Sequence, residues 1–298
     1  MAESDPSGGW RVVLFTAAPG LIPQTEGWLT DRGHKLVGLV ASPGPRSRRT
    51  DDYLGVATYA RPGVDLVVTN HPNRLADMIR PMRPDLIICA GFNWKIPEKV
   101  LDIPRLGTVN VHDSLLPKYR GRNAIGWTLR NDDQECGFTL HFMSPDFDTG
   151  SILAQRSIRI TDEDYSFASV FPRLLAALEE AMFEVLDRIK AGDPGTPQNE
   201  SQATYTGGAF EPAWREIDWS DSARQNFVKV RSWYGTRDVP RGAFGDIDGK
   251  RCLITATKLA SQQSNATSPG TVLERRDDGT LLIHCGDTPL EILEWAPV

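Results

Sequence analysis

The chain has 298 residues, of which 40% are hydrophobic and 24% charged, and its formal net charge is -6. This composition is that of an ordinary globular protein with one large or two medium domains, and it excludes a disordered or fibrous chain. No apolar run approaches the roughly 20 residues of a membrane-spanning helix, and residues 1–9 lack the basic and apolar regions of a signal peptide. We therefore predict a disordered tail at residues 1–9, no membrane partner and a cytoplasmic location.

Short apolar runs at residues 11–15, 35–41, 65–69, 85–90 and 107–112 predict strands. Helical segments are predicted between them, at 23–32 and 73–80, and apolar residues at helical spacing predict a long core helix at 166–190. Strands that alternate with helices indicate βαβ units, and therefore an α/β fold with a twisted, mostly parallel sheet. Continuous apolar strands agree with burial on both faces of that sheet.

The character of the sequence changes after residue 190. Residues 191–205 are rich in Gly and Pro and predict a linker. A helix is expected between Ser220 and Trp233, with Ser220 or Asp221 as its cap. Five short strand-like runs follow and predict a small β-rich module, a partly open barrel. The predicted organisation is thus a domain at 10–190, a linker at 191–205 and a second domain at 206–298.

The four cysteines are Cys89, Cys136, Cys252 and Cys285, and none belongs to a C-x-x-C pair. Three of them lie in apolar, strand-like runs. We predict buried free thiols, with a zinc site or a disulfide framework as the alternative.

Three polar residues are candidates for chemistry. Asn110 and His112 are two residues apart in a predicted strand, so their side chains point to the same face. A second predicted strand, residues 136–143, ends in an acidic turn that carries Asp148. In open α/β sheets, ligands bind beyond the carboxyl ends of the strands. An amide, an imidazole and a carboxylate at such an edge suit acyl transfer to an amine, because they supply an oxyanion donor, a proton shuttle and a group that orients the shuttle.

Each of these residues also has a simpler structural interpretation. A single histidine in a strand is more often structural than catalytic, but Asn110 beside His112 favours function. His141 is interpreted as structural and Asp146 as solvent-facing. A metal cluster of His112, Asp113 and Asp148 is the weaker alternative, and we predict no metal. The glycines after the first strand do not form G-x-G-x-x-G and no Walker sequence is present, which argues against a dinucleotide- or P-loop-binding protein.

The run V-N-V-H-D-S-L-L-P-K-Y-R-G at residues 109–121, together with D-T-G at 148–150, resembles the signature of the 10-formyltetrahydrofolate-dependent formyltransferases. The resemblance covers about residues 11–190 and continues more weakly through P-G-T-V-L at 269–273 and I-H-C-G-D at 283–287. It implies a Rossmann-like catalytic domain with helices on both faces of the sheet, an OB-like C-terminal barrel, and 10-formyltetrahydrofolate as cosubstrate.

The resemblance also implies roles for individual residues. Asn110 would donate its amide to the oxyanion of the tetrahedral intermediate, and one such donor is typically worth ~3 kcal/mol. His112 would relay a proton, and Asp148 would orient the imidazole. The cosubstrate would be held largely through backbone groups of the 89–94 segment, the S-L-L-P loop and the acidic turn, with these named contacts: Cys89, Ala90, Gly91, Phe92, Ser114, Leu115, Leu116, Pro117, Asp146 and Phe147.

The acceptor is inferred from charge and from departures in the signature. The basic run P-R-S-R-R at residues 45–49 is short. Residues 200–298 contain 11 Lys and Arg against 14 Asp and Glu, a net charge of -3, which is the wrong sign for wrapping tRNA. The run R-N-A-I-G-W at 122–127 also departs from the small residues and Pro that the tRNA enzymes carry there. We therefore predict a small-molecule amine as acceptor, an amino sugar or a specialised-metabolite amine, with tRNA disfavoured.

Three alternatives remain open at this point. The chain is a methionyl-tRNA formyltransferase in the first. In the second it is a formyltetrahydrofolate hydrolase, in which water replaces the amine. The third is a folate-binding protein without catalysis. The sequence does not determine the oligomeric state, and a homodimer is one arrangement considered.

Overall fold

The computed structural model describes residues 8–42, 51–92, 94–164, 167–233, 241–261 and 268–298. Nearly all of the predicted tail at 1–9, and the basic run at 45–49, lie outside these residues. The chain forms two compact units. The first comprises Met1–Arg120, Phe138–Arg156 and Ala176–Thr204, and the second comprises Gly121–Gly137, Ser157–Leu175 and Tyr205–Val298. The domain boundaries expected from the sequence stay a prediction.

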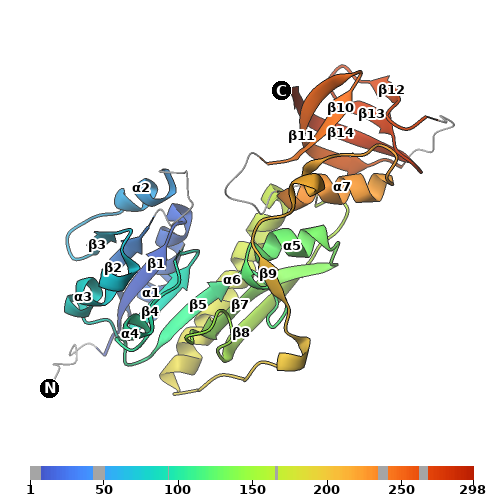
Figure 1. Cartoon of the computed structure of the whole chain (residues 1–298). Coiled ribbons are helices and arrows are strands. Elements are labelled where there is room, and N and C mark those ends of the chain that lie inside the picture. Colours follow the sequence, from blue (N-terminus) through green and yellow to red (C-terminus); the bar gives the residue numbers. More distant parts are fainter. Residues whose placement is uncertain (1–7, 43–50, 93, 165–166, 234–240, 262–267) are drawn as a thin grey trace. The chain divides into compact units, whose positions relative to one another are not determined.

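A seven-stranded sheet is the centre of the α/β part, with strand order β3-β2-β1-β4-β5-β7-β8 (Figure 1). The pairs from β3 through β5 are parallel, whereas β7 runs antiparallel to β5. The strands are β1 (Arg11–Thr16), β2 (Lys35–Ala41), β3 (Asp65–Val68), β4 (Leu86–Ala90), β5 (Thr108–His112), β7 (Glu135–Phe142) and β8 (Ile152–Arg159). The expected Rossmann-like, mostly parallel sheet is confirmed.

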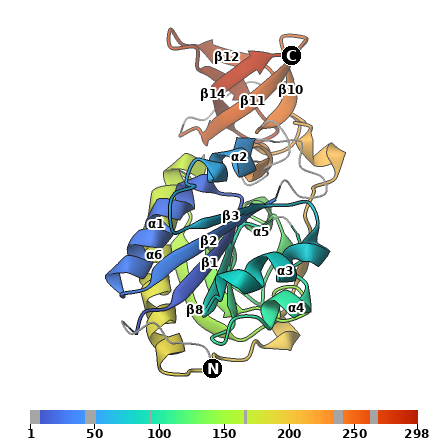
Figure 2. The same ribbon diagram turned by 90° about the vertical axis from the view of Figure 1, so that its left-hand side faces the viewer.

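Helices cover both faces of this sheet (Figure 2), with α1 and α6 on one side and α3 and α4 on the other. Alternation along β1 explains the two layers, because Val13 and Phe15 belong to the same buried cluster as Leu75, Ile79 and Val100 of α3 and α4. The helices of this part are α1 (Ile22–Asp31), α2 (Asp51–Ala57), α3 (Leu75–Ile79), α4 (Glu98–Leu101), α5 (Ala124–Arg130) and α6 (Phe167–Lys190).

The helix predicted over residues 73–80 is shorter than expected. Its α-helical part, Leu75–Ile79, is flanked by the 3-10 turns η2 (Pro72–Arg74) and η3 (Arg80–Met82). Pro72 and Pro81 lack the backbone N–H that a longer α-helix needs, so the chain tightens at both ends. Other 3-10 turns are η1 (Pro19–Leu21), η4 (Glu200–Gln202) and η5 (Pro212–Arg215).

The antiparallel pairing of β5 with β7 positions the site described below. In this register Asn110 lies opposite His141, and His112 lies opposite Thr139. Residues directly opposite each other in a ladder point to the same face of the sheet. Four polar side chains from two neighbouring strands are therefore presented on one face.

The C-terminal part is a five-stranded antiparallel sheet of order β10-β11-β14-β13-β12, which confirms the expected β-rich domain. Its core joins Phe227 of α7 (Ala223–Ser232) to Ile254, Ile283 and Ile292 of the sheet. The strands are β10 (Ala243–Ile247), β11 (Lys250–Leu259), β12 (Val272–Arg275), β13 (Leu281–His284) and β14 (Pro289–Pro297). A separate two-stranded sheet joins β6 (Arg120–Arg122) to β9 (Tyr205–Gly207).

The cap expected for the C-terminal helix was wrong by one or two residues. Ser222 caps α7 in a capping box with Gln225. Asp221 instead binds the ammonium group of Lys229 at 2.7 Å. A serine that can exchange two hydrogen bonds with Gln225 satisfies two of the free N–H groups at the helix start, which a carboxylate alone does not.

All four cysteines lie in the described residues, and each is buried and free. Burial raises the pKa of the thiols of Cys89, Cys136 and Cys285 to about 12, because an apolar environment penalises the thiolate. Within the described ranges, none of the helices combines the length and apolarity needed to cross a membrane.

Candidate active site

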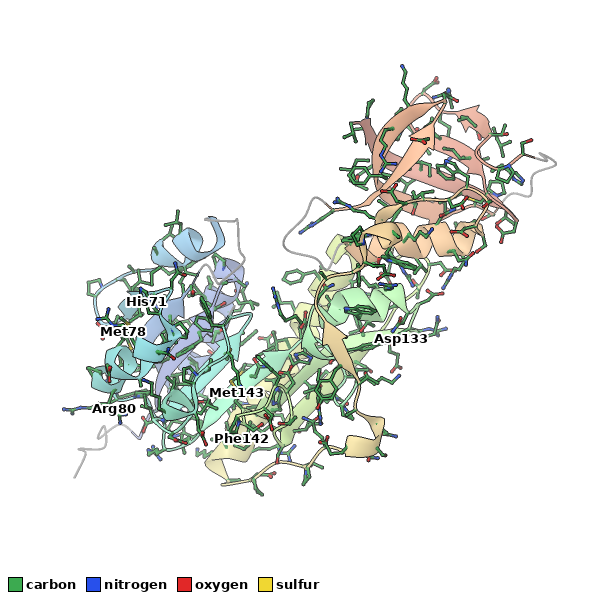
Figure 3. The ribbon with its side chains drawn as sticks, in the orientation of Figure 1. His71, Met78, Arg80, Asp133, Phe142 and Met143 are labelled. Atoms are coloured by element: carbon green, nitrogen blue, oxygen red, sulfur yellow. The ribbon has the colours of Figure 1, made fainter. Side chains whose placement is uncertain are left out.

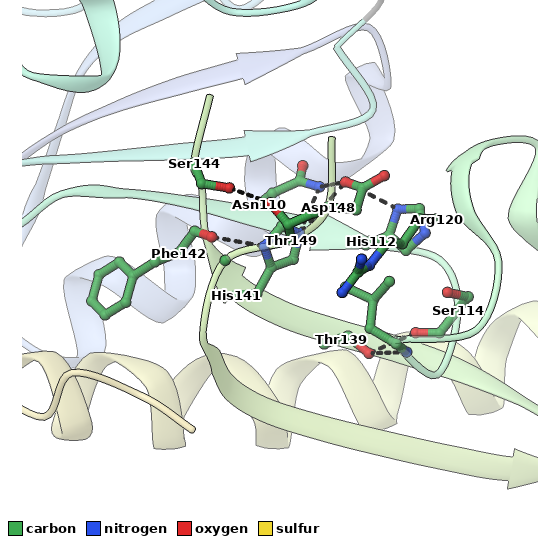
Figure 4. A network of polar contacts seen from close by, with 12 residues as sticks. Asn110, His112, Ser114, Arg120, Thr139, His141, Phe142, Ser144, Asp148 and Thr149 are labelled. Carbon is green, nitrogen blue, oxygen red and sulfur yellow. Dashed lines mark hydrogen bonds and ion pairs between the residues drawn. The ribbon is translucent and has the colours of Figure 1, made fainter. Parts of the chain in front are cut away.

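Asn110, His112 and Asp148 meet near the carboxyl end of β5 (Figure 4). The Asn110 amide nitrogen Nδ2 donates to Asp148 Oδ1 at 3.3 Å, and His112 Nδ1 lies 3.7 Å from the same oxygen. β5 supplies the first two residues, and the turn after β7 supplies the third. The structure thus places the three side chains expected from the sequence around one point, while their catalytic roles stay a prediction.

The amide of Asn110 has a defined orientation because of its neighbours. His141 Nδ1 lies 2.8 Å from the carbonyl oxygen of Phe142, and a carbonyl only accepts, so Nδ1 carries the proton. The other ring nitrogen, Nε2, is then an acceptor, and it lies 3.2 Å from Asn110 Nδ2. Both N–H groups of Asn110 therefore have acceptors, one on His141 and one on Asp148.

The tautomer of His112 follows from the same reasoning. Its Nε2 lies 2.8 Å from the carbonyl oxygen of Tyr119 and must donate to it. In the neutral imidazole Nδ1 then has a free lone pair that faces the Asp148 carboxylate. The side chains of His112 and Asp148 are only 5% and 10% exposed. His112 Nδ1 and the Asp148 carboxylate thus face each other in a largely buried position, which is the geometry expected of a proton shuttle and the group that orients it.

The loop after β5 is held by a short hydrogen-bond network. Thr139 Oγ1 donates to the carbonyl of Ser114 at 2.7 Å and accepts from the backbone N–H of Leu116 at 3.0 Å. Ser114 Oγ donates to the carbonyl of Lys118 at 2.7 Å. The peptide bond between Leu116 and Pro117 is cis. The three hydrogen bonds connect the S-L-L-P loop to β7 and to Lys118, beside His112.

His141 and Asp148 line a cleft that is open to solvent and has a volume of about 330 Å³ with the solvent at its mouth included. Met143, one of its wall residues, follows Phe142 directly at the end of β7 (Figure 3). The wall is formed by Trp94, Lys95, Ile96, His141, Met143, Ser144, Pro145, Asp146, Phe147 and Asp148.

The expected cosubstrate contacts divide into two groups. Asp146 and Phe147 line the cleft and are exposed, and Trp94 lines it at the end of the 89–94 segment. The structure does not place the others in its wall. Cys89 and Ala90 are buried in β4, and Gly91 follows them with a φ of 71°. Phe92 packs on Phe15. The remaining expected contacts form the loop described above: Ser114, Leu115, Leu116 and Pro117.

His141 belongs to the site, although its sequence context indicated a structural residue. It is buried, at 1% exposure, yet it contacts Asn110 and lies 3.6 Å from Asp148 Oδ1. The antiparallel register that brings it opposite Asn110 is a long-range feature, which strand periodicity alone does not reveal. Among the residues described, no group of three or more His, Cys, Asp and Glu side chains is arranged to bind a metal.

Gly150 controls the position of the acidic turn. A Cβ at this position would overlap the carbonyl oxygen of Phe142. We expect Gly150→Ala to displace the turn that carries Asp148 and to lower kcat about 10- to 100-fold. Gly20→Ala is the matched control, because its Cβ would meet no atom within 4 Å. Steady-state kinetics and thermal unfolding of both variants check this, and an unchanged kcat in Gly150→Ala would contradict it.

Two family models match the chain. The model described as formyl transferase matches residues 37–186, and the model described as formyl transferase, C-terminal domain, matches residues 210–297. Together they extend over both the α/β part and the C-terminal sheet. This confirms the resemblance carried by the signature at residues 109–121.

Curated relatives and solved structures agree with these models. The methionyl-tRNA formyltransferase of Pelobacter propionicus is 32% identical over 95% of this chain and 88% of its own length. HypX from Aquifex aeolicus, solved in complex with tetrahydrofolic acid, is 22% identical with a TM-score of 0.68 over 96% of this chain and 44% of its own. A sugar N-formyltransferase from Shewanella sp. is 15% identical with a TM-score of 0.65 over 85% of this chain and 99% of its own.

The prediction of a small-molecule amine as acceptor, with tRNA disfavoured, is contradicted. Other curated relatives at 30% to 36% identity are also methionyl-tRNA formyltransferases, and several match more than nine-tenths of this chain. The error has a physical cause. Net charge is a sum over a whole surface, whereas binding of a polyanion depends on where the charges lie. The net charge of -3 over residues 200–298 therefore did not exclude this acceptor.

The site and the relatives agree on the kind of chemistry. An amide, an imidazole and a carboxylate meet at Asp148, which also lines the cleft, and the family models match over most of the chain. The chain belongs to the formyltransferase family and is an enzyme that transfers a formyl group.

Proposed function

We propose that the chain transfers the formyl group of 10-formyltetrahydrofolate to the amino group of methionyl-tRNA. The observation that carries this proposal is the extent of the match to relatives with that name, which covers 95% of the chain in the Pelobacter enzyme. The match thus includes the C-terminal sheet as well as the α/β part. A cytoplasmic location, where charged tRNA is available, is part of the proposal.

The residues around Asp148 suit each step of such a transfer. The amine lone pair attacks the formyl carbon, and the carbonyl electron pair moves to oxygen. There Asn110 donates to the developing charge an N–H that it otherwise gives to Asp148 or His141. His112 takes the proton that the amine loses, at Nδ1, and Asp148 stabilises the resulting imidazolium. The carbon–nitrogen bond to the folate then breaks, and His112 returns the proton to that nitrogen. One amine becomes a formamide, and one folate nitrogen regains its hydrogen.

The cleft also suits the cosubstrate. Trp94, Met143 and Phe147 offer aromatic and apolar surface to a flat ring system. The exposed Lys95 lies 5.3 Å from the ring centre of Phe147 and supplies a positive charge for the carboxylates of the folate tail. His141 and Asp148, at the inner end of the cleft, are where the formyl group would be presented.

The test is a transfer assay with 10-formyltetrahydrofolate and four acceptor conditions: methionyl-tRNA, uncharged tRNA, a nucleotide-linked amino sugar, and no acceptor. We expect formylmethionyl-tRNA to form in a one-to-one ratio with deformylated folate, and little folate turnover in the other three. Formate release without an acceptor would identify a hydrolase. Formylation of the amino sugar in preference to methionyl-tRNA would overturn the proposed acceptor.

A further inference from the structure

The segment after α6 contacts the acidic turn through Gln198. Its side-chain nitrogen Nε2 donates to the carbonyl oxygens of Asp148 and Gly150, each at 2.8 Å. Asp148 has a φ of 56°, a left-handed conformation that is uncommon outside glycine and persists where surrounding structure supports it. Gln198 supplies two hydrogen bonds to the backbone at this point.

Arg120 determines which way the amide of Gln198 faces. Its guanidinium is fully buried, and its Nη2 and Nε donate to Gln198 Oε1 at 2.8 and 3.2 Å. The same group donates to both carboxylate oxygens of Glu200, at 2.7 and 2.8 Å. A guanidinium has donors only, so the oxygen of Gln198 must face Arg120 and the nitrogen must face the Asp148 turn.

Thr204 makes the corresponding contacts on the His112 side. Its Oγ1 accepts from the backbone N–H of Tyr119, and its carbonyl accepts from the N–H of Arg120, each at 2.8 Å. Its own N–H donates to the carbonyl of Pro117 at 3.1 Å. Tyr119 has a φ of 59°, and its carbonyl is the group that accepts from His112 Nε2. Thr204 therefore stabilises the turn that selects the tautomer of His112.

We infer that Gln198 and Thr204 are positioning residues for formyl transfer, and that with Arg120 they form a clasp that orients Asp148 through its backbone and His112 through Tyr119. None of the three needs to touch a substrate for this role. The inference goes beyond the proposed acceptor, because it depends on the roles of His112 and Asp148 and applies to any amine.

The first test is the tautomer of His112. The full-length enzyme labelled with ¹⁵N in its histidines is compared with Thr204→Val, which keeps the side-chain volume but removes the acceptor for Tyr119, and with Thr204→Ser, which retains it. We expect the wild type and Thr204→Ser to hold the proton on Nε2 of His112. Thr204→Val should show a second tautomer or averaging between the two, and a kcat about 10- to 100-fold lower. An unchanged tautomer in a folded Thr204→Val would overturn the inference for His112.

The second test addresses Asp148. Gln198→Met removes both donors to the turn and the acceptor for Arg120, and we expect kcat to fall about 10- to 100-fold with little change in the KM for the folate. Ser201→Ala is the control from the same segment, because the Ser201 hydroxyl donates to Asn199 at 2.8 Å and to none of the groups above. A lower melting temperature with kcat unchanged would mean that Gln198 supports the fold only.

The two tests separate this inference from the proposed acceptor. The tautomer is measured without any acceptor, and kcat is measured with the amine that the wild type uses. A wild-type enzyme that does not formylate methionyl-tRNA would refute the proposed function and leave both tests readable.

Discussion

Replacement of Asn110 by alanine is expected to lower kcat about 100- to 1,000-fold, with a smaller change in the KM for the folate. The formyl carbonyl of an amide is a weak electrophile, so a fixed donor contributes most when negative charge develops on its oxygen. Before the substrate binds, both N–H groups of Asn110 have acceptors, Asp148 Oδ1 at 3.3 Å and His141 Nε2 at 3.2 Å, so one of these bonds is exchanged for the oxyanion during the reaction.

Two further variants make this prediction specific. Asn110→Leu has a similar side-chain volume and no donor, so it separates the lost hydrogen bond from a lost shape. Asn73→Ala is the control, because Asn73 is exposed and its backbone oxygen, which binds Lys99, is retained. Single-turnover rates measure the chemical step directly. A Leu variant that keeps more than about a tenth of the wild-type rate would contradict the assigned role.

Asp148→Asn is expected to lower kcat about 100- to 10,000-fold. The substitution keeps the shape of the side chain, and asparagine tolerates the left-handed backbone at this position as well as aspartate does. It removes the negative charge that lies 3.7 Å from His112 Nδ1, so the imidazolium formed during transfer loses its counter-charge. The oxygen that accepts from Asn110 is retained, which leaves the donor in place.

The measurement is kcat with saturating folate and acceptor, together with a folate dissociation constant for the inactive variant. Binding within about three-fold of the wild type, with turnover lost, is the expected pattern. Asp31→Asn serves as the control, since Asp31 is exposed at the end of α1. If Asp148→Asn binds folate normally and turns over at the wild-type rate, the carboxylate has no part in proton transfer.

Much of the fold could be predicted from local patterns. The run predicted at residues 35–41 has the same bounds as β2. Continuous β-branched and apolar residues bounded by turn formers are strong strand signals, and Lys35–Ala41 shows this pattern clearly. Asn110 and His112 were placed on one face by strand alternation alone, and the register of β5 agrees with that placement.

Two elements, β8 and α5, were not predicted from the sequence, and the physical reason is the same for both. β8 contains three polar residues in succession, Gln155 to Ser157, so it lacks a clear strand pattern. Gln155 has its partners in Leu116 and Thr139, which are distant in sequence. α5 is short and follows directly after the signature loop, so its helical pattern covers only two turns. In each case the stabilising contacts are long-range, and a local window does not contain them.

The clasp could not be predicted from local sequence either, because its contacts are also long-range. Gln198 and Thr204 lie in a segment whose Gly and Pro content predicts a linker, and local sequence shows nothing of their partners at Asp148 and Tyr119. Their function depends on contacts with residues 50 and 85 positions earlier in the chain. Composition describes how such a segment begins and ends, but not what it binds.

The distance along the chain between Tyr119 and Thr204 has a consequence for biosynthesis. Proteins are made from the N-terminus, and the strands that carry Asn110 and His141 leave the ribosome well before Thr204 does. A nascent chain can pair β5 with β7 before the hydrogen bond from the backbone N–H of Tyr119 to Thr204 has formed. The contacts that Thr204 makes with the turn beside His112 therefore form late in synthesis, after the sheet that carries Asn110 and His112 can already have assembled.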